Sequence, residues 1–180
     1  MKKALIVVDY QKDFVTGSLG FPGAETLDKV IAAKIQEYRS SGGDVIVTLD
    51  THAENYLETQ EGRNLPIVHC VRDTDGWNLF GETAKQIWET DCRFEKSTFG
   101  SLALAEYLKE RGYEQVELVG LVSNICVISN AVLAKAALPD AQIIVDAACT
   151  ASNDEAMNEK ALDVMEGIQI KVIHRQGESN

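Results

Sequence analysis

The stretch Val-Glu-Leu-Val-Gly-Leu-Val-Ser-Asn-Ile-Cys-Val-Ile-Ser-Asn-Ala, residues 116–131, decides the fold of this chain. An apolar β-type run ends at Gly120 and Leu121, a short polar turn follows, and a helical pattern begins around Cys126. At the start of a helix, unpaired backbone N–H groups and the positive end of the dipole favour the thiolate, the nucleophilic form of cysteine. A buried structural cysteine is the alternative for this stretch taken alone.

The same alternation of apolar runs and helical patterns extends along the whole chain. It predicts strands at 4–9, 44–50, 92–95, 115–121, 142–146 and 168–173, and helices at 24–41, 101–111, 125–137 and 153–165. Short, continuous apolar strands separated by helices indicate a parallel sheet that is covered on both faces. We therefore expect one three-layer α/β/α domain over residues 1–180, with a central, mostly parallel sheet.

Two segments do not follow this pattern. Residues 51–90 lack a clean period and predict a long loop region with one helical piece near 82–89, and long irregular segments in compact domains are often functional. Residues 176–180 form a polar tail.

Composition narrows the possible partners and compartment. With 17 basic and 28 acidic residues, the net charge of −11 argues against nucleic acid and anionic membrane surfaces as partners. The four cysteines form no CxxC pair, which indicates reduced thiols in a cytoplasmic protein. The apolar run at 4–8 is too short for a secretory signal, and no window reaches the length of a membrane span.

Polar side chains follow the predicted strand ends. Asp9 closes the first strand, Asp50 closes the second, Lys96 follows the run at 92–95, and Cys126 follows the strand at 115–121. Ligands of such sheets bind at the carboxyl ends of the strands, so we expect these four side chains to converge at one edge.

The first candidate constellation is Asp9, Lys96 and Cys126. A cysteine that attacks an amide needs an acceptor for its proton, a charge that favours the thiolate, and donors for the developing oxyanion. Asp9 would supply the first and Lys96 the second, and backbone N–H groups at 122–126 would supply the third. The alternative is a strand-end Asp with an ordinary turn bond and a solvated Lys on the surface.

The second candidate constellation is Asp50, His52 and His69. Only three histidines occur in the chain, and two of them fall in the 51–90 loop region. Carboxylate oxygens and imidazole nitrogens suit a divalent ion, Zn²⁺ first and Mn²⁺ or Fe²⁺ otherwise, although two loop histidines can also make ordinary hydrogen bonds. The same loop offers a further carboxylate ligand, best Glu61 and otherwise Glu58 or Glu54.

Taken together, the motifs are similar to those of the isochorismatase-like cysteine hydrolases, and within them to the nicotinamidases, also called pyrazinamidases. The matching pieces appear in family order and span most of the chain: ALIVVDYQKDF at 4–14, TLDTH at 48–52, LPIVHC at 65–70, FEKSTF at 94–99 and GLVSNICV at 120–127.

This resemblance implies a Rossmann-like fold, the catalytic triad Asp9, Lys96 and Cys126, and metal ligation by Asp50, His52 and His69. It also implies a cis peptide between Leu121 and Val122, which would aim the Val122 N–H, with that of Cys126, at the oxyanion. Many nicotinamidases carry another histidine where this chain reads Ala-Glu-Asn-Tyr-Leu at 53–57, and Glu61 is our candidate for the missing ligand.

The activity implied is hydrolysis of nicotinamide to nicotinate and ammonia, with the pyridine nitrogen bound to the ion. Phe14, Phe99 and Trp77 are candidates for the walls around the ring, with core packing as the alternative for each. A related amidohydrolase acting on a ureido or carbamoyl amide is a second possibility, and a phospho-receiver domain with Asp50 as the acceptor is a distant third. Members of this family often form dimers or larger assemblies, so a homo-oligomer is a further expectation.

Overall fold

The computed structural model describes residues 1–175, so the predicted polar tail at 176–180 lies outside the described residues. The strands are β1 (Lys3–Val8), β2 (Asp44–Asp50), β3 (Cys92–Lys96), β4 (Gln115–Leu121), β5 (Gln142–Ala151) and β6 (Lys171–Ile173). The helices are α1 (Lys12–Val15), α2 (Leu27–Ser40), α3 (Gln60–Asn64), α4 (Gly81–Gln86), α5 (Leu102–Arg111), α6 (Ile128–Ala137) and α7 (Glu155–Gly167). Shorter helical turns are η1 (Ala24–Thr26), η2 (Tyr56–Glu58), η3 (Asp75–Trp77) and η4 (Ser123–Val127).

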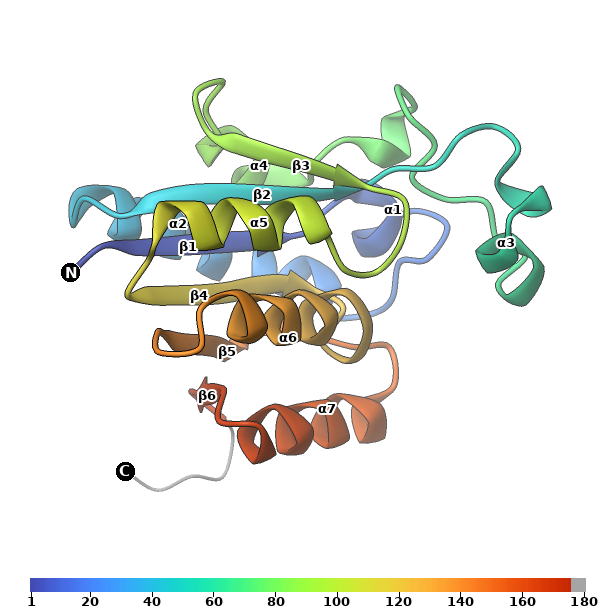
Figure 1. Cartoon of the computed structure of the whole chain (residues 1–180). Helices are drawn as coiled ribbons and strands as arrows, with labels where there is room; N and C mark the ends of the chain where they lie inside the picture. The colour runs from blue at the N-terminus through green and yellow to red at the C-terminus, as the bar shows by residue number, and fades with distance from the viewer. Residues whose placement is uncertain (176–180) are drawn as a thin grey trace.

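The strands form one sheet in the order β3-β2-β1-β4-β5-β6, and every paired neighbour is parallel (Figure 1). The predicted α/β class and parallel sheet are therefore confirmed. The chain moves from β1 outward to β2 and β3, then returns to the other side of β1 with β4. Such a reversal leaves a crevice at the carboxyl ends of β1 and β4, which is where ligands bind in sheets of this kind.

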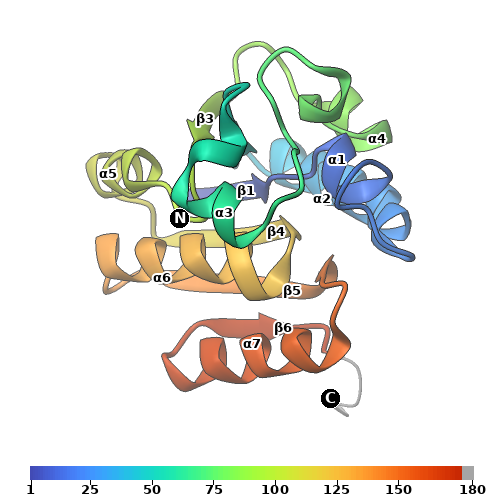
Figure 2. The same cartoon turned by 90° about the vertical axis from the view of Figure 1, so that its right-hand side faces the viewer.

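Helices cover both faces of the sheet (Figure 2). On one face, Ile6 and Val8 of β1 pack with apolar residues of α5, α6 and α7. On the other, Leu5 and Val7 pack with apolar residues of α2. Because successive side chains of a strand point to opposite faces, a strand buried on both sides must be apolar throughout, which explains the unbroken run at the start of the chain.

The boundaries differ from expectation at the C-terminal end of the sheet. β5 continues to Ala151, five residues further than predicted, and α7 begins after Asp154, whose carboxylate accepts a hydrogen bond from the Met157 N–H at 3.0 Å. Residues 168–170 were expected to open the last strand. They instead close α7, because the Ile170 N–H bonds to the Met165 carbonyl and Gln169 takes a positive φ of 69°.

The segment at 51–90 contains more helical structure than its lack of a clean period predicts. It holds η2, α3, η3 and α4, and the predicted helical piece at 82–89 is shorter, at Gly81–Gln86. The fully buried Tyr56 anchors the first half, and its hydroxyl donates to the Leu65 carbonyl at 2.9 Å. Among the described residues, no helix has both the length and the apolar character needed to cross a bilayer.

Candidate functional site

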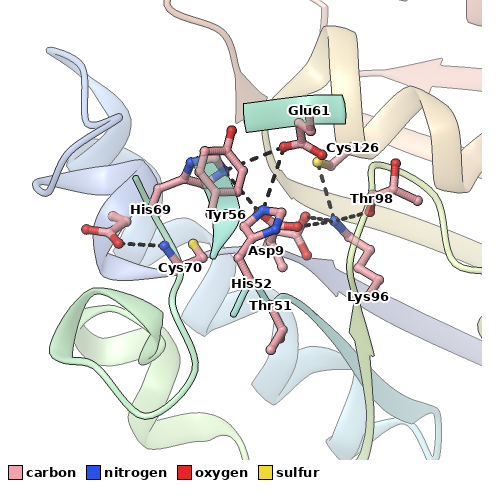
Figure 3. A network of polar contacts seen from close by, with 12 residues as sticks. Asp9, Thr51, His52, Tyr56, Glu61, His69, Cys70, Lys96, Thr98 and Cys126 are labelled. Atoms are coloured by element: carbon pink, nitrogen blue, oxygen red, sulfur yellow. Dashed lines mark hydrogen bonds and ion pairs between the residues drawn. The ribbon is translucent and has the colours of Figure 1, made fainter. Parts of the chain in front are cut away.

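Four consecutive strand ends deliver buried polar side chains to one point. Asp9 follows β1, Lys96 ends β3, and Cys126 lies in η4 directly after β4 (Figure 3). Asp50 ends β2. All four are buried, so charges that are normally solvated face one another here. The convergence predicted from the strand pattern is confirmed by these positions.

Lys96 is the centre of the cluster. Its amine Nζ lies 2.6 Å from Asp9 Oδ2, 3.4 Å from Asp50 Oδ1 and 3.5 Å from Cys126 Sγ. It also donates to the Thr98 carbonyl at 3.0 Å. Burial lowers the pKa of this amine, but the carboxylates of Asp9 and Asp50 outweigh that effect and raise the pKa above the ordinary value. Lys96 is therefore a fixed buried cation rather than a solvated surface lysine.

Asp9 is held in an unusual backbone conformation, with φ at 44°. The Thr48 hydroxyl donates to its Oδ1 at 2.6 Å, and the Asp9 N–H donates to the same hydroxyl oxygen at 3.2 Å. Burial raises the pKa of this carboxyl, and the charge of Asp50 acts in the same direction, while Lys96 opposes them. A carboxylate with a raised pKa is a stronger base and, once protonated, can act as an acid near neutral pH.

The environment of Cys126 differs from expectation. It is the fourth residue of the wide turn η4, which begins at Ser123, and single π-helical turns are frequent at functional sites. Burial raises the pKa of the thiol well above its ordinary range, the charge of Asp9 adds to this, and Lys96 opposes it. Burial and the facing carboxylate thus oppose ionisation of the thiol, so a base that takes its proton is needed for attack.

The turn before Cys126 has the peptide geometry that the family resemblance implied. The bond between Leu121 and Val122 is cis. Gly120 precedes it with φ at 109°, and a Cβ at this position would lie 2.1 Å from the Val8 carbonyl oxygen. Only glycine allows this turn to pass so close to β1, which is what brings Cys126 beside Asp9.

Beside this cluster, Asp50, His52 and His69 place one donor atom each within 4.8 Å of one another. Asp50 Oδ2 lies 3.0 Å from His52 Nε2 and 3.3 Å from His69 Nε2. Glu61 Oε1 approaches the same two nitrogens at 3.6 and 3.8 Å. Two ligands of a tetrahedral zinc, each about 2.0–2.1 Å from the metal, are about 3.4 Å apart, so the donor set fits one small divalent ion.

Further contacts suit a metal-binding role for the imidazoles. His69 Nδ1 lies 2.7 Å from the Ile67 carbonyl, which requires a proton on Nδ1 and leaves Nε2 free to face the cluster. Burial raises the pKa of Glu61, and the charge of Asp50 adds to this effect. Glu58 and Glu54, the alternative candidates, are both exposed.

Residues that the sequence analysis missed hold these donors in place. Tyr56 lies beside both imidazoles, with ring centroids 4.6 Å from His52 and 4.9 Å from His69. The buried Gln11 side chain bonds both backbone groups of Asp50, accepting from its N–H at 2.8 Å and donating to its carbonyl at 2.9 Å. A glutamine two residues after the aspartate that closes an apolar strand is a signal that could have pointed to this role.

A cavity of about 170 Å³ opens onto both groups of residues. Its wall contains Asp50, Glu61, His69, Cys126 and Asn153, together with Phe14, Leu19, Phe21, Leu65, Phe99, Val122 and Ile125. The structure therefore places Phe14 and Phe99 in the cavity wall, as predicted. Leu19, Phe21, Leu65 and Asn153 come from loops, and no periodic pattern marks them.

Trp77 does not occupy the predicted position. It is absent from the described wall of the cavity, and its indole N–H donates to the Thr51 hydroxyl at 2.8 Å. It packs against the α2 side of the core. Its role in the structure is thus to support the loop after β2 rather than to contact a bound ring, which was the packing alternative given for this residue.

Comparisons with known proteins agree with this geometry. The model of the isochorismatase domain matches residues 3–176. A nicotinamidase from Acinetobacter baylyi is 29% identical over 174 residues, which cover 80% of this chain and 79% of the relative. The crystal structure of nicotinamidase/pyrazinamidase PncA from Bacillus subtilis is 29% identical, with a TM-score of 0.84 over 96% of this chain and 99% of that one.

A pyrazinamidase of Pyrococcus horikoshii, solved in complex with zinc, superimposes with a TM-score of 0.85 over 97% of this chain and 100% of that one. At 24% identity, this match shows that the two chains share a fold. The family resemblance drawn from the motifs is confirmed by the domain match. This chain belongs to the isochorismatase domain family.

Proposed function

We propose that this protein is a nicotinamidase, an amidohydrolase that converts nicotinamide, and pyrazinamide as a related amide, to the acid and ammonia through a thioester on Cys126. The observation that carries the proposal is the position of the Lys96 amine, 2.6 Å from Asp9 and 3.5 Å from Cys126, beside an apolar cavity that also reaches Asp50, Glu61 and His69. The similarity to a nicotinamidase over most of both chains supports it. The reaction would belong to NAD salvage in the cytoplasm.

In the first half-reaction, the Cys126 thiol gives its proton to Asp9 as the sulfur attacks the carboxamide carbon. The charge that develops on the carbonyl oxygen is stabilised by the N–H groups of Val122 and Cys126, and loss of one such donor typically costs about 2.7–4 kcal/mol of barrier. Asp9 returns the proton to the departing nitrogen as the C–N bond breaks. Ammonia then leaves, and the acyl group stays on sulfur.

In the second half-reaction, Asp9 takes a proton from a water molecule that attacks the thioester. The acid is released and the thiolate regains the proton from Asp9. Lys96 keeps its charge throughout, and it stabilises whichever member of the Asp9–Cys126 pair is negative. General acid help of this kind typically contributes about 10²- to 10⁴-fold, which matters because an amide nitrogen is a poor leaving group.

The residues proposed to hold a divalent ion, zinc first and manganese or iron otherwise, are Asp50, His52, His69 and Glu61. The donor chemistry and spacing of Asp50, His52 and His69 fit such an ion, and Glu61 is the fourth candidate because it faces both imidazole nitrogens. When bound, the ion supplies a coordination position for a ring nitrogen and so fixes the orientation of a flat aromatic amide. The apolar wall around Phe14 and Phe99 suits the faces of such a ring.

The rival substrates fit this cavity less well. The rival is a ureido or carbamoyl amide. If such a compound carries a carboxylate, it meets two carboxylates in the described wall, Asp50 and Glu61, and no lysine or arginine. The distant receiver-domain alternative needs an accessible phosphate acceptor. Asp50 is buried and is hydrogen-bonded to His52, which makes it a poor candidate for that role.

The test is ammonia release from nicotinamide by the wild-type chain, by Cys126→Ala, and by wild type treated with a chelator. We expect turnover by the wild type, none by Cys126→Ala, and loss with the chelator that added metal reverses. Cys92→Ala is the matched control, because Cys92 bonds only to Tyr107 among the described side chains and should leave the rate unchanged. Full activity of Cys126→Ala would rule out the proposed mechanism. Turnover of a carbamoyl compound that resists the chelator would favour the rival substrate.

A further inference from the structure

Thr48 is a polar residue within an otherwise apolar central strand. β2 reads Asp-Val-Ile-Val-Thr-Leu-Asp, and the four residues around Thr48, at 45–47 and 49, are buried and apolar. Thr48 itself is fully buried. A hydroxyl in such a place is costly unless it is hydrogen-bonded, so the identity of its partner shows why it is tolerated.

The partner of the Thr48 hydroxyl is the carboxylate of Asp9. The hydroxyl donates to Asp9 Oδ1 at 2.6 Å, and its oxygen accepts the Asp9 N–H at 3.2 Å. One side chain therefore bonds both the backbone and the carboxylate of Asp9, whose φ is positive. The parallel register sets this contact, since Thr48 pairs with Val8, the residue directly before Asp9.

The two oxygens of Asp9 are consequently not equivalent. Oδ1 is occupied by a short hydrogen bond from Thr48. Oδ2 is buried as well, receives no bond from Thr48, and faces Lys96 Nζ at 2.6 Å. It is the oxygen with spare capacity to accept a proton, and the Lys96 amine that it meets is 3.5 Å from Cys126 Sγ.

We propose that Thr48 is a positioning residue that assigns the proton transfers of the reaction to Asp9 Oδ2, by holding Oδ1 and the Asp9 backbone in one orientation. This inference rests on the proposed amidohydrolase function. In the first step the S–H bond of Cys126 breaks and an O–H bond forms at Oδ2, while sulfur bonds to the carboxamide carbon. That O–H bond later breaks as the leaving nitrogen takes the proton, which restores the carboxylate.

Without the Thr48 hydroxyl, the carboxylate can rotate and share its two oxygens between Lys96 and the thiol. A misplacement of about 1 Å in a catalytic group can cost about 10²-fold in rate. We therefore expect Thr48→Val, which keeps the branched shape of threonine, to lower kcat by about 10- to 100-fold. Binding of substrate and metal should not change, because Thr48 is not among the described residues that line the cavity.

The experiment compares the wild type with Thr48→Val, Thr48→Ser and Thr83→Val. Thr83→Val is the matched control: Thr83 in α4 is also fully buried, and its hydroxyl donates a hydrogen bond to the backbone carbonyl of Asp28 in α2, away from Asp9. For each protein, kcat and KM are measured on an amide that the wild type hydrolyses, together with bound metal per chain and the thermal midpoint. If Thr48→Val does not fold, Thr48→Ala takes its place, since it removes the hydroxyl without adding volume.

The expected result is a loss in kcat for Thr48→Val with KM and metal content within twofold of wild type, near-complete recovery in Thr48→Ser, and no loss in Thr83→Val. The proposal is overturned if Thr48→Val keeps kcat within twofold of wild type, or if Thr48→Ser is as slow as Thr48→Val. A wild-type protein that hydrolyses another amide but not nicotinamide would overturn the proposed substrate only, and the comparison of the Thr48 variants would still apply.

Discussion

Replacement of Lys96 by methionine tests the electrostatic core of the site. Methionine keeps an unbranched apolar stem and removes the one positive charge that lies between Asp9 Oδ2 at 2.6 Å and Cys126 Sγ at 3.5 Å. Since Lys96 is buried, little solvent screening softens the change. The substitution should therefore act on the thiol and on its base together.

The size of the effect follows from these distances. Two unit charges 3.5 Å apart attract by about 5 kcal/mol at an effective dielectric constant of about 20. At about 1.36 kcal/mol for each unit of pKa, loss of that attraction makes the thiol of Cys126 harder to ionise by roughly 10³-fold. Burial already raises the pKa of Cys126 and of Asp9, so removal of the cation moves both pKa values further in the same direction.

We expect Lys96→Met to lower kcat/KM for the amide by about 10³-fold, and to slow alkylation of Cys126 by iodoacetamide at neutral pH. The first is measured by ammonia release and the second by mass spectrometry of the labelled peptide. Lys12→Met is the matched control, because Lys12 forms an exposed ion pair with Asp75 and such pairs contribute little. A folded Lys96→Met protein with kcat/KM within tenfold of wild type would refute the assigned role of this charge.

Three further changes have defined outcomes. Glu61→Gln should weaken zinc binding by at least about tenfold in a calorimetric titration, since one of four proposed donors loses its charge, whereas Glu58→Gln, at an exposed position, should bind as wild type does. Gly120→Ala should lower the free energy of unfolding in urea by more than about 2 kcal/mol, because φ is 109° and the new Cβ would lie 2.1 Å from a β1 carbonyl oxygen; an unchanged midpoint would contradict that geometry. Lys34→Met should destabilise the fold by about 3–5 kcal/mol at neutral pH, because Lys34 Nζ joins the buried carboxylates of Glu117 at 2.5 Å and Asp146 at 2.6 Å. Burial raises the pKa of Asp146, but the ion pair with Lys34 more than offsets this effect, so the pKa of Asp146 in the folded protein lies below the ordinary 3.8. The stabilisation from this ion pair is therefore present above pH 3.8 and is lost as the pH falls below it. The unfolding curves of the wild type and Lys34→Met should converge at that low pH.

The strand ends were predictable because they depend on one robust rule. A strand buried on both faces is largely apolar, so the first charged residue after the apolar run marks its end, as Asp9 and Asp50 do. Parallel strands then bring these ends together at one edge of the sheet, independently of the conformation of the loops. Lys96 and Cys126 were predicted from their positions after the runs at 92–95 and 115–121, and the metal candidates from two histidines in one loop.

The remainder depends on contacts between distant segments, which no local pattern encodes. The short helices at 56–64 form around Tyr56, which is buried against the imidazoles that face the site. Phe21 and Asn153, which lie in two loops far apart in the sequence, both line the cavity. Trp77 looked like a ring-binding residue because aromatic side chains favour both cores and pockets, and only the fold decides between them.

The two oxygens of Asp50 face in opposite directions, Oδ2 toward the imidazoles and Oδ1 toward Lys96. The Asp50 carboxylate thus belongs both to the proposed metal ligands and to the charged groups around Cys126. A substitution of Asp50 that changes the ion preference would also disturb the sulfur. Among the described ion pairs, His52 and His69 contact only the Oδ2 atom of Asp50, and Glu61 contacts only the two imidazoles. Adaptation to a different ion is therefore expected to proceed through those three positions, with Asp50 left in place.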